Sequence, residues 1–156
     1  MSVGVKKLQE EYRYIRRKGV LASINGSASP INKDFLHWSG CFMGPENTPY
    51  ANGFYYFEMK FTDEYPNKGP SVQMRTPVIH PNIFPINGHI CVSYLSSWNS
   101  TYNITGIAMA IFNLLNDPSS KLDSSSLQKA ENFKNKYALP IQNIDWNNSW
   151  DKGWTV

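Results

Sequence analysis

A strict alternation of side chains between positions 54 and 61 constrains the fold of this 156-residue chain more than any other feature. Large apolar residues occupy every second position, and the residues between them are mostly polar. A period of two places the two sets on opposite faces of a β-strand. We therefore expect a strand with Tyr55, Phe57, Met59 and Phe61 on one face and Tyr56, Glu58 and Lys60 on the other.

Three further segments have strand character, at 20–24, 35–43 and 71–76. Connections rich in turn-forming residues separate the four segments. Strands joined by tight connections pair as antiparallel neighbours, because a parallel pair requires a long crossover. The segments therefore predict a four-stranded antiparallel meander. Its connections contain the Gly-Ser-Ala-Ser-Pro loop at 26–30, Gly44-Pro45, Tyr65-Pro66 and Gly69-Pro70.

Helical periodicity appears on both sides of these strands. Within 4–17, apolar residues recur at intervals of three and four, and Gly19 is a suitable stop. A wide apolar stripe over 104–115 is typical of a buried central helix. Either Asn103 or Thr101 caps its start, and Asp117-Pro118 ends it.

A further helix is expected to begin near Ser124–Ser126 and to stop before Pro140. The tail beyond it is rich in tryptophan. We conclude that residues 1–156 form a single α+β domain. It would contain an N-terminal helix, a four-stranded antiparallel meander, an irregular segment that carries the site, and C-terminal helices. The tail contains Ile141, Ile144, Trp146, Trp150 and Trp154.

Composition narrows the classes of function. The net charge is only +3, and no run approaches the roughly 18 apolar residues of a membrane span, so we expect neither nucleic acid nor membrane as a partner. Without an export signal, the chain is expected in the cytoplasm or nucleus, with free thiols. Basic residues crowd the first 18 positions, where they form either a solvated helix face or a dock for an acidic protein. These are Lys6, Lys7, Arg13, Arg16, Arg17 and Lys18.

The segment 77–102 has no periodicity, yet it contains Trp, Phe, Ile and Cys. A long irregular stretch inside a compact domain is commonly functional when it is not disordered. Its thiol, Cys91, lies downstream of Asn82 in the run His80-Pro81-Asn82. A thiol can carry an acyl group as a thioester, and an amide can donate to the oxyanion when a second nucleophile attacks. Asn82 also suits a structural role, in which it fixes the loop through backbone hydrogen bonds.

Other readings of these residues remain open. A cysteine hydrolase would use Cys91 with His80 or His89 and Asn82, but no hydrolase signature flanks the cysteine. We expect His80 to bond to backbone and His89 to be exposed. The second cysteine, Cys41, lies in a strand pattern and is expected in the core. The chain offers no credible set of four zinc ligands, and we expect no metal or organic cofactor.

A series of landmarks between about Lys6 and Tyr137 resembles the ubiquitin-conjugating enzymes, and the resemblance weakens after about residue 140. Each landmark alone is weak, but together they occur in the family's order and near its spacing. They are Phe35-Leu36-His37-Trp38, Met43-Gly44-Pro45, Thr48-Pro49-Tyr50, Gly53-Phe54, Tyr65-Pro66, Pro70, His80-Pro81-Asn82-Ile83, Asn87-Gly88-His89-Ile90-Cys91, Trp98 and Leu114-Leu115-Asn116-Asp117-Pro118.

The resemblance implies an acyltransferase that works as a monomer. Cys91 would take ubiquitin or a ubiquitin-like protein as a thioester from an activating enzyme, which uses the ATP. It would then pass this modifier to a lysine of a protein substrate, usually with a ubiquitin ligase. Lys6, Lys7 and Arg13 lie on the surface that relatives offer to the activating enzyme. The same fold also occurs as a non-catalytic ubiquitin-binding cofactor, but such variants generally lack the cysteine.

The loop after the central helix offers one candidate for an acidic group near the thioester. Family members often carry an acidic residue or a serine in the loop after the central helix, and Asp123 is the candidate here for orienting the acceptor amine. The alternative is that Asp123 caps the following helix. Ser93, two residues after Cys91, stands where many relatives have Asp.

Two loops that relatives use to bind ligases have altered sequences here. Asn67 replaces an aromatic residue, and Asn99, Ser100 and Thr101 replace the usual Ser-Pro-Ala. Loss of an aromatic anchor and of a rigid proline is expected to weaken or redirect that contact. The segment 80–91 is also one residue longer than is common, and 91–98 is one shorter, so the orientation of Asn82 can differ from that in relatives.

Overall fold

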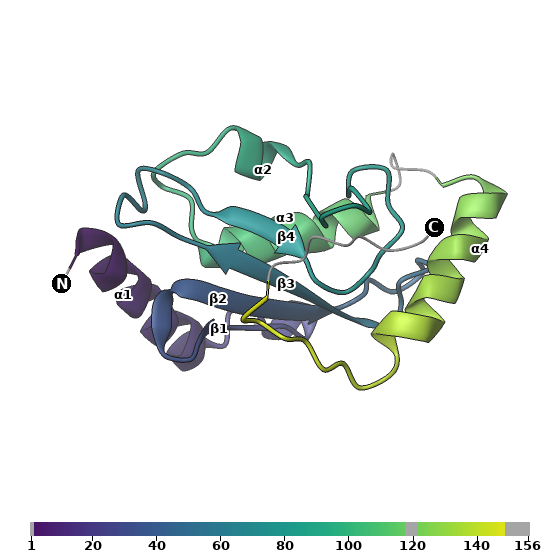
Figure 1. Cartoon of the computed structure of the whole chain (residues 1–156), viewed down its shortest axis with the longest axis horizontal. Coiled ribbons are helices and arrows are strands. Elements are labelled where there is room, and N and C mark those ends of the chain that lie inside the picture. The colour runs from purple at the N-terminus through teal and green to yellow at the C-terminus, as the bar shows by residue number, and fades with distance from the viewer. Residues whose placement is uncertain (1, 118–121, 149–156) are drawn as a thin grey trace.

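The computed structural model describes residues 2–117 and 122–148 of the chain. One long α-helix precedes the strands and the other α-helices follow them, so the predicted α+β class is confirmed (Figure 1). The elements in order are α1 (Val3–Lys18), the 3₁₀ turn η1 (Ala22–Ile24), β1 (Ser27–Ile31), β2 (Asp34–Met43), β3 (Phe54–Lys60), β4 (Ser71–Met74), α2 (Ser93–Ser96), α3 (Ile104–Asn116), α4 (Ser124–Phe133) and the π-helical turn η2 (Lys134–Ala138).

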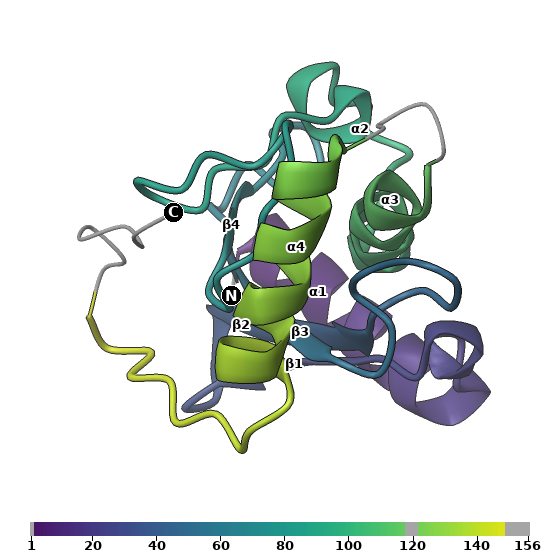
Figure 2. The ribbon, with the colours of Figure 1, turned by 90° about the vertical axis from the view of Figure 1, so that its right-hand side faces the viewer.

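The strands form one antiparallel sheet in the order β1-β2-β3-β4, which confirms the meander. α1 contacts the sheet through Tyr12, whose ring centroid lies 5.7 Å from that of Trp38. α3 contacts it through Phe112, 5.8 Å from Phe42. Trp38 and Phe42 point to the same side of β2, so α1 and α3 cover one face and the core lies beneath them. Figure 2 shows α4 standing across one end of the sheet.

Capping side chains set the helix starts. Ser2 caps α1 by accepting the N–H of Val5, and Gly19 ends the helix with φ 59, a left-handed conformation that glycine adopts without strain. α3 is capped by Asn103, whose side chain accepts the N–H of Gly106 at 2.8 Å, rather than by Thr101. α4 begins one residue after Asp123, which is its cap.

The first strand was predicted in the wrong place. Residues 20–24 contain the turn η1, and its capping residue Leu21 and its last residue Ile24 are both buried, three positions apart. β1 instead occupies most of the segment expected to be a loop, including Pro30. Proline is tolerated there because β1 lies at the edge of the sheet, where a missing N–H removes no essential bond.

Two smaller expectations also fail. Cys41 is only partly buried and lies outside the core, because it points to the side of β2 opposite Phe42 and its Sγ lies 3.4 Å from Ser27 Oγ. The segment 77–102 is largely irregular, as expected, but contains the short helix α2. No helix within the described ranges is long and apolar enough to cross a membrane.

The sheet face opposite α1 and α3 is crossed by residues 139–148. The guanidinium of Arg75 donates to the carbonyl of Asp145 at 3.0 Å and lies 5.2 Å from the ring centroid of Trp146. The Trp146 ring also lies 6.5 Å from that of Tyr56. The described part of the tail is therefore packed on the sheet, while Trp150 and Trp154 lie outside the described residues.

Glu58, on the sheet face that this segment crosses, is buried more deeply than the sequence indicated. Glu58 alternates with core residues in β3 and was expected on the more polar face, yet it is only 2% exposed. Its carboxylate accepts from Arg75 at 3.0 Å and contacts His37 Nε2 at 2.5 Å. A buried carboxylate requires such partners, because desolvation of an unpaired charge is costly.

Candidate active site

The candidate active site is built on a short two-stranded ribbon. Ile83 pairs with Ile90, and the N–H of Phe84 donates to the carbonyl of His89 at 2.9 Å. The ribbon turns through Gly88, which has φ 71 and approaches Met74 so closely that an added Cβ would lie 2.2 Å from the Met74 carbonyl oxygen. Glycine is therefore required at this turn.

Asn82 and Cys91 face each other at the open end of this ribbon. The Cys91 N–H donates to the Asn82 carbonyl at 2.8 Å, and the Asn82 side-chain Nδ2 donates to the Cys91 carbonyl at 3.0 Å. Cys91 is exposed. An asparagine amide carries two N–H donors, and the bond to Cys91 uses only one of them. The structure thus brings the two predicted residues together and gives Asn82 a structural bond as well.

His80 has the structural role that was expected. Its ring is buried, Nδ1 accepts the N–H of Asn82 at 3.0 Å, and Nε2 therefore donates to the Leu114 carbonyl at 3.1 Å. Burial lowers the pKa of His80, which favours the neutral ring that this bonding requires. Both ring nitrogens are occupied by backbone groups, so His80 is not placed to serve as a base for Cys91.

His89 is exposed, as expected, and its ring stacks on Phe84 with centroids 6.0 Å apart. None of the described contacts joins it to Cys91. Within 2–117 and 122–148, no three His, Cys, Asp or Glu side chains are grouped so that they could hold a metal ion. The geometry offers nothing specific to a cysteine hydrolase.

Asp123 lies across a pocket from the His80-Pro81 segment. Its Oδ1 accepts the N–H of Ser126 at 2.7 Å, which makes it the N-cap of α4. This hydrogen bond is the largest cause of a lowered pKa for the Asp123 carboxyl, which is fully exposed. No described contact joins Asp123 to Cys91 or Asn82, so its role toward an acceptor amine stays a prediction.

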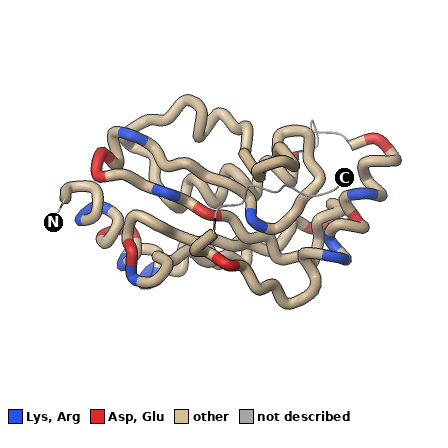
Figure 3. The backbone as a smooth tube through the Cα atoms, viewed as in Figure 1, with Lys and Arg blue, Asp and Glu red and all other residues tan. Residues whose placement is uncertain are grey.

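The residues predicted to bind partners gather at one end of the molecule. Near the start of α1, Gly4 packs so closely on the backbone of Thr62 and Asp63 that an added Cβ would lie 2.9 Å from an oxygen. Figure 3 marks the basic residues of α1 at this end. Lys6 and Arg13 are exposed, and Lys7 is partly buried.

The two altered loops are linked to each other at the same end. Trp98 Nε1 donates to the carbonyl of Pro66 at 2.7 Å, one residue before the exposed Asn67. In the second loop, Asn99 Oδ1 accepts the N–H of Thr101 at 2.9 Å and its hydroxyl at 2.8 Å. Asn99, Ser100 and Thr101 are all exposed.

Comparison with known proteins agrees with this architecture. The sequence model of the ubiquitin-conjugating enzyme family matches residues 7–145. The ubiquitin-conjugating enzyme E2 2 of Trichoderma harzianum is 35% identical over 108 residues, 66% of this chain and 71% of that protein. The E2 2 of Saccharomyces cerevisiae is 33% identical over 119 residues, 76% of this chain and 68% of that protein.

A solved structure shows the same fold. A Plasmodium yoelii protein described as a ubiquitin-conjugating enzyme superposes with a TM-score of 0.78 at 24% identity, covering 90% of this chain and 99% of that one. Together, the fold and the matches define an enzyme of the thioester-forming transferase class. The chain belongs to the ubiquitin-conjugating enzyme family. Members of this family act with ubiquitin, an activating enzyme and a ligase.

Sequence reasoning missed two features around the site. One is the pocket beside the ribbon, whose walls come from residues about 40 positions apart and therefore leave no periodic signal. The other is the covering of the sheet by the tail. Two features of the sequence indicated this covering. One is Glu58, an acidic residue that alternates with core residues, and the other is the tryptophan-rich tail.

Proposed function

We propose that Cys91 is the residue that carries the modifier. Its thiolate attacks the carbonyl carbon of the thioester on the activating enzyme, a new C–S bond forms, and the activating enzyme's thiolate leaves. Because the bonds formed and broken are of one kind, the exchange is nearly balanced and needs little activation. The exposed position of Cys91, beside the Asn82 amide, is the observation that supports this proposal.

In the second step, a lysine amine attacks the Cys91 thioester, an isopeptide bond forms, and the Cys91 thiolate leaves. The amine, with an ordinary pKa of about 10.4, must lose a proton to become a nucleophile. Asn82 would stabilise the oxyanion of the tetrahedral intermediate with an N–H of its amide. Its bond to the Cys91 carbonyl holds that amide next to the cysteine.

The partner surfaces follow from the exposed end described above. Lys6, Lys7 and Arg13 would meet an acidic surface of the activating enzyme, and Asn67 with Asn99, Ser100 and Thr101 would meet the ligase. We further propose a monomer that acts in the cytoplasm or nucleus and that binds neither a membrane nor nucleic acid. The mild net charge of +3 and the lack of a long apolar run in the sequence support the last part.

The test is incubation with an activating enzyme, ATP and a panel of modifiers. A reductant-sensitive adduct should form with one modifier and be absent from Cys91→Ala. Cys41→Ala is the matched control and should load normally, because Cys41 is remote from the ribbon in β2. Absence of any wild-type adduct would favour a non-catalytic ubiquitin-binding protein, and a normal adduct on Cys91→Ala would reject the assignment.

A further inference from the structure

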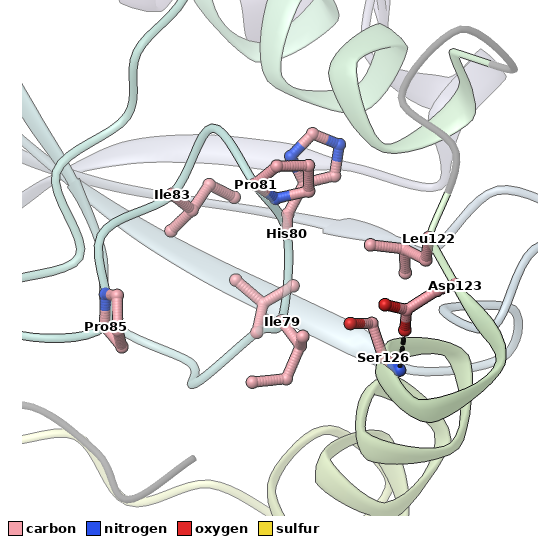
Figure 4. Close-up of a pocket in the computed structure, with 9 residues that line it drawn as sticks. Ile79, His80, Pro81, Ile83, Pro85, Leu122, Asp123 and Ser126 are labelled. Atoms are coloured by element: carbon pink, nitrogen blue, oxygen red, sulfur yellow. Dashed lines mark hydrogen bonds between the residues drawn. The ribbon is translucent and has the colours of Figure 1, made fainter.

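A pocket of about 310 Å³ lies between the active-site ribbon and the start of α4. In Figure 4, Ile79, Pro81 and Pro85 line one side, and Leu122 and Asp123 line the other. The walls are mainly aliphatic or proline side chains. The volume is at the lower end of the range for ligand sites, which suits a single long side chain rather than a folded partner.

The pocket adjoins the proposed thioester without containing it. Pro81 and Ile83 form part of its wall, and they flank Asn82, which bonds twice to Cys91. Neither Asn82 nor Cys91 lines the pocket. A peptide whose lysine reaches Cys91 would therefore place a neighbouring residue, and not the lysine itself, at this pocket.

The charge of the pocket rim selects the kind of side chain. The Asp123 carboxyl has a lowered pKa and is ionised at neutral pH, and it is fully exposed although it caps α4. Its full negative charge exceeds the roughly half positive charge of a helix N-terminus. Aliphatic walls beneath an exposed carboxylate fit a side chain with an apolar stem and a cationic head.

We propose that this pocket binds an arginine or lysine side chain that flanks the acceptor lysine in the protein substrate. The inference rests on the proposed thioester at Cys91 and adds a preference for basic acceptor sequences. Lys129 acts electrostatically on Asp123 and competes with the ligand, so the preference is modest. An exposed ion pair of this kind corresponds to an effect of about two- to fivefold.

The experiment uses peptides whose N-terminus is acetylated and which contain one lysine with a free side-chain amine. A single arginine is placed in turn at each position around that lysine. The loaded protein is discharged to each peptide, to matched peptides with norleucine or glutamate, and to free lysine. At one position, arginine should give a kcat/KM about two- to fivefold above glutamate. The kcat/KM of the norleucine peptide should lie between these two values, because norleucine contacts the apolar walls of the pocket without pairing with Asp123.

Three variants separate the contributions. Asp123→Asn keeps a good helix cap and removes the charge. When the rate for each peptide is divided by the rate for free lysine, the advantage of arginine over norleucine should vanish, whatever the variant does to free lysine. Ser126→Phe fills the pocket from α4 and keeps the capping N–H, so arginine and norleucine should both lose their advantage. Lys129→Gln removes the competing cation and should increase the preference for arginine.

Binding is also measured apart from the chemistry. Titration of the unloaded protein with the arginine peptide should shift the methyl NMR signals of Ile79 and Leu122, and the glutamate peptide should shift them less. Absence of these shifts overturns the proposal that the pocket binds a basic side chain, even if Cys91 loads normally. Failure to load rejects only the proposed thioester. An unchanged ratio of arginine to norleucine rates in Asp123→Asn would also overturn it, even if all rates fall together, because Asp123 would then act on the acceptor amine and not on the flanking side chain.

Discussion

At the scale of single residues, the Asn82 amide has one N–H that bonds the Cys91 carbonyl and a second that the chemistry can use. Asn82→Ala removes both. We expect thioester loading to be nearly intact, because exchange between thioesters needs little oxyanion stabilisation. Discharge to free lysine should slow by roughly 10²–10³, the usual cost of losing one oxyanion donor. Single-turnover loading and discharge assays measure the two steps, and equal loss in both would assign Asn82 to structure alone.

The position of Asn82 depends on a neutral His80, because protonation of Nδ1 removes the acceptor for the Asn82 N–H. Burial lowers the pKa of His80 below its ordinary value of 6.5, so the unfolded state binds more protons between the two values. The free energy of unfolding should therefore fall as the pH drops below about 6.5 and through the folded-state pKa. Urea unfolding at several pH values measures this dependence.

Two variants isolate that contribution. His80→Gln does not titrate and should lose this part of the pH dependence, while His89→Gln, at an exposed position, should keep it. The comparison with wild type is necessary because Glu11 changes the free energy of unfolding with pH in the direction opposite to His80. Burial raises the Glu11 pKa above 4.5, so its contribution to stability is lost as the pH rises through the raised value. Identical pH profiles for His80→Gln and wild type would contradict the assignment.

At the scale of elements, the sequence predicted those segments whose own periodicity decides their structure. β3 was predicted because its core residues alternate, and α1 because its apolar residues recur every three or four positions. β1 was missed because Ser27, Ser29 and Pro30 carry little strand preference of their own. Pairing with β2 imposes their conformation, and such tertiary context overrides local propensity.

The exposed basic face of α1 carries the next prediction. Lys6 and Arg13 are seven residues apart and so lie on the same side of the helix. Changing both to Glu should slow loading by about tenfold at low ionic strength, and the defect should shrink as salt screens the charges. Lys7 is left unchanged because it acts on the buried Glu11. Lys33→Glu, an exposed change outside α1, is the control; a salt-independent loading rate in wild type would exclude steering by this face.

At the scale of the whole molecule, the pairing of Asn82 with Cys91 could be predicted from the sequence, but the surroundings of the site could not. The pairing lies within one continuous segment. The pocket needs the ribbon and α4 to meet, and the covered sheet face needs Trp146 to reach Arg75, some 70 positions away. Contacts between distant segments leave no periodic pattern, so they follow only from the folded chain.

The same long-range packing joins the two altered loops, since Trp98 of one donates to Pro66 beside Asn67 of the other. If they form one ligase-binding surface, generic ring-finger or thioester-forming ligases should stimulate discharge only weakly. Asn67→Phe together with Ser100→Pro should raise ligase-stimulated discharge about tenfold or more, because a buried aromatic anchor contributes about 2 kcal/mol at an interface. Loading should not change, and Asn67→Ala with Ser100→Ala should give no gain. Strong stimulation of the unmodified protein by both kinds of ligase would contradict this prediction.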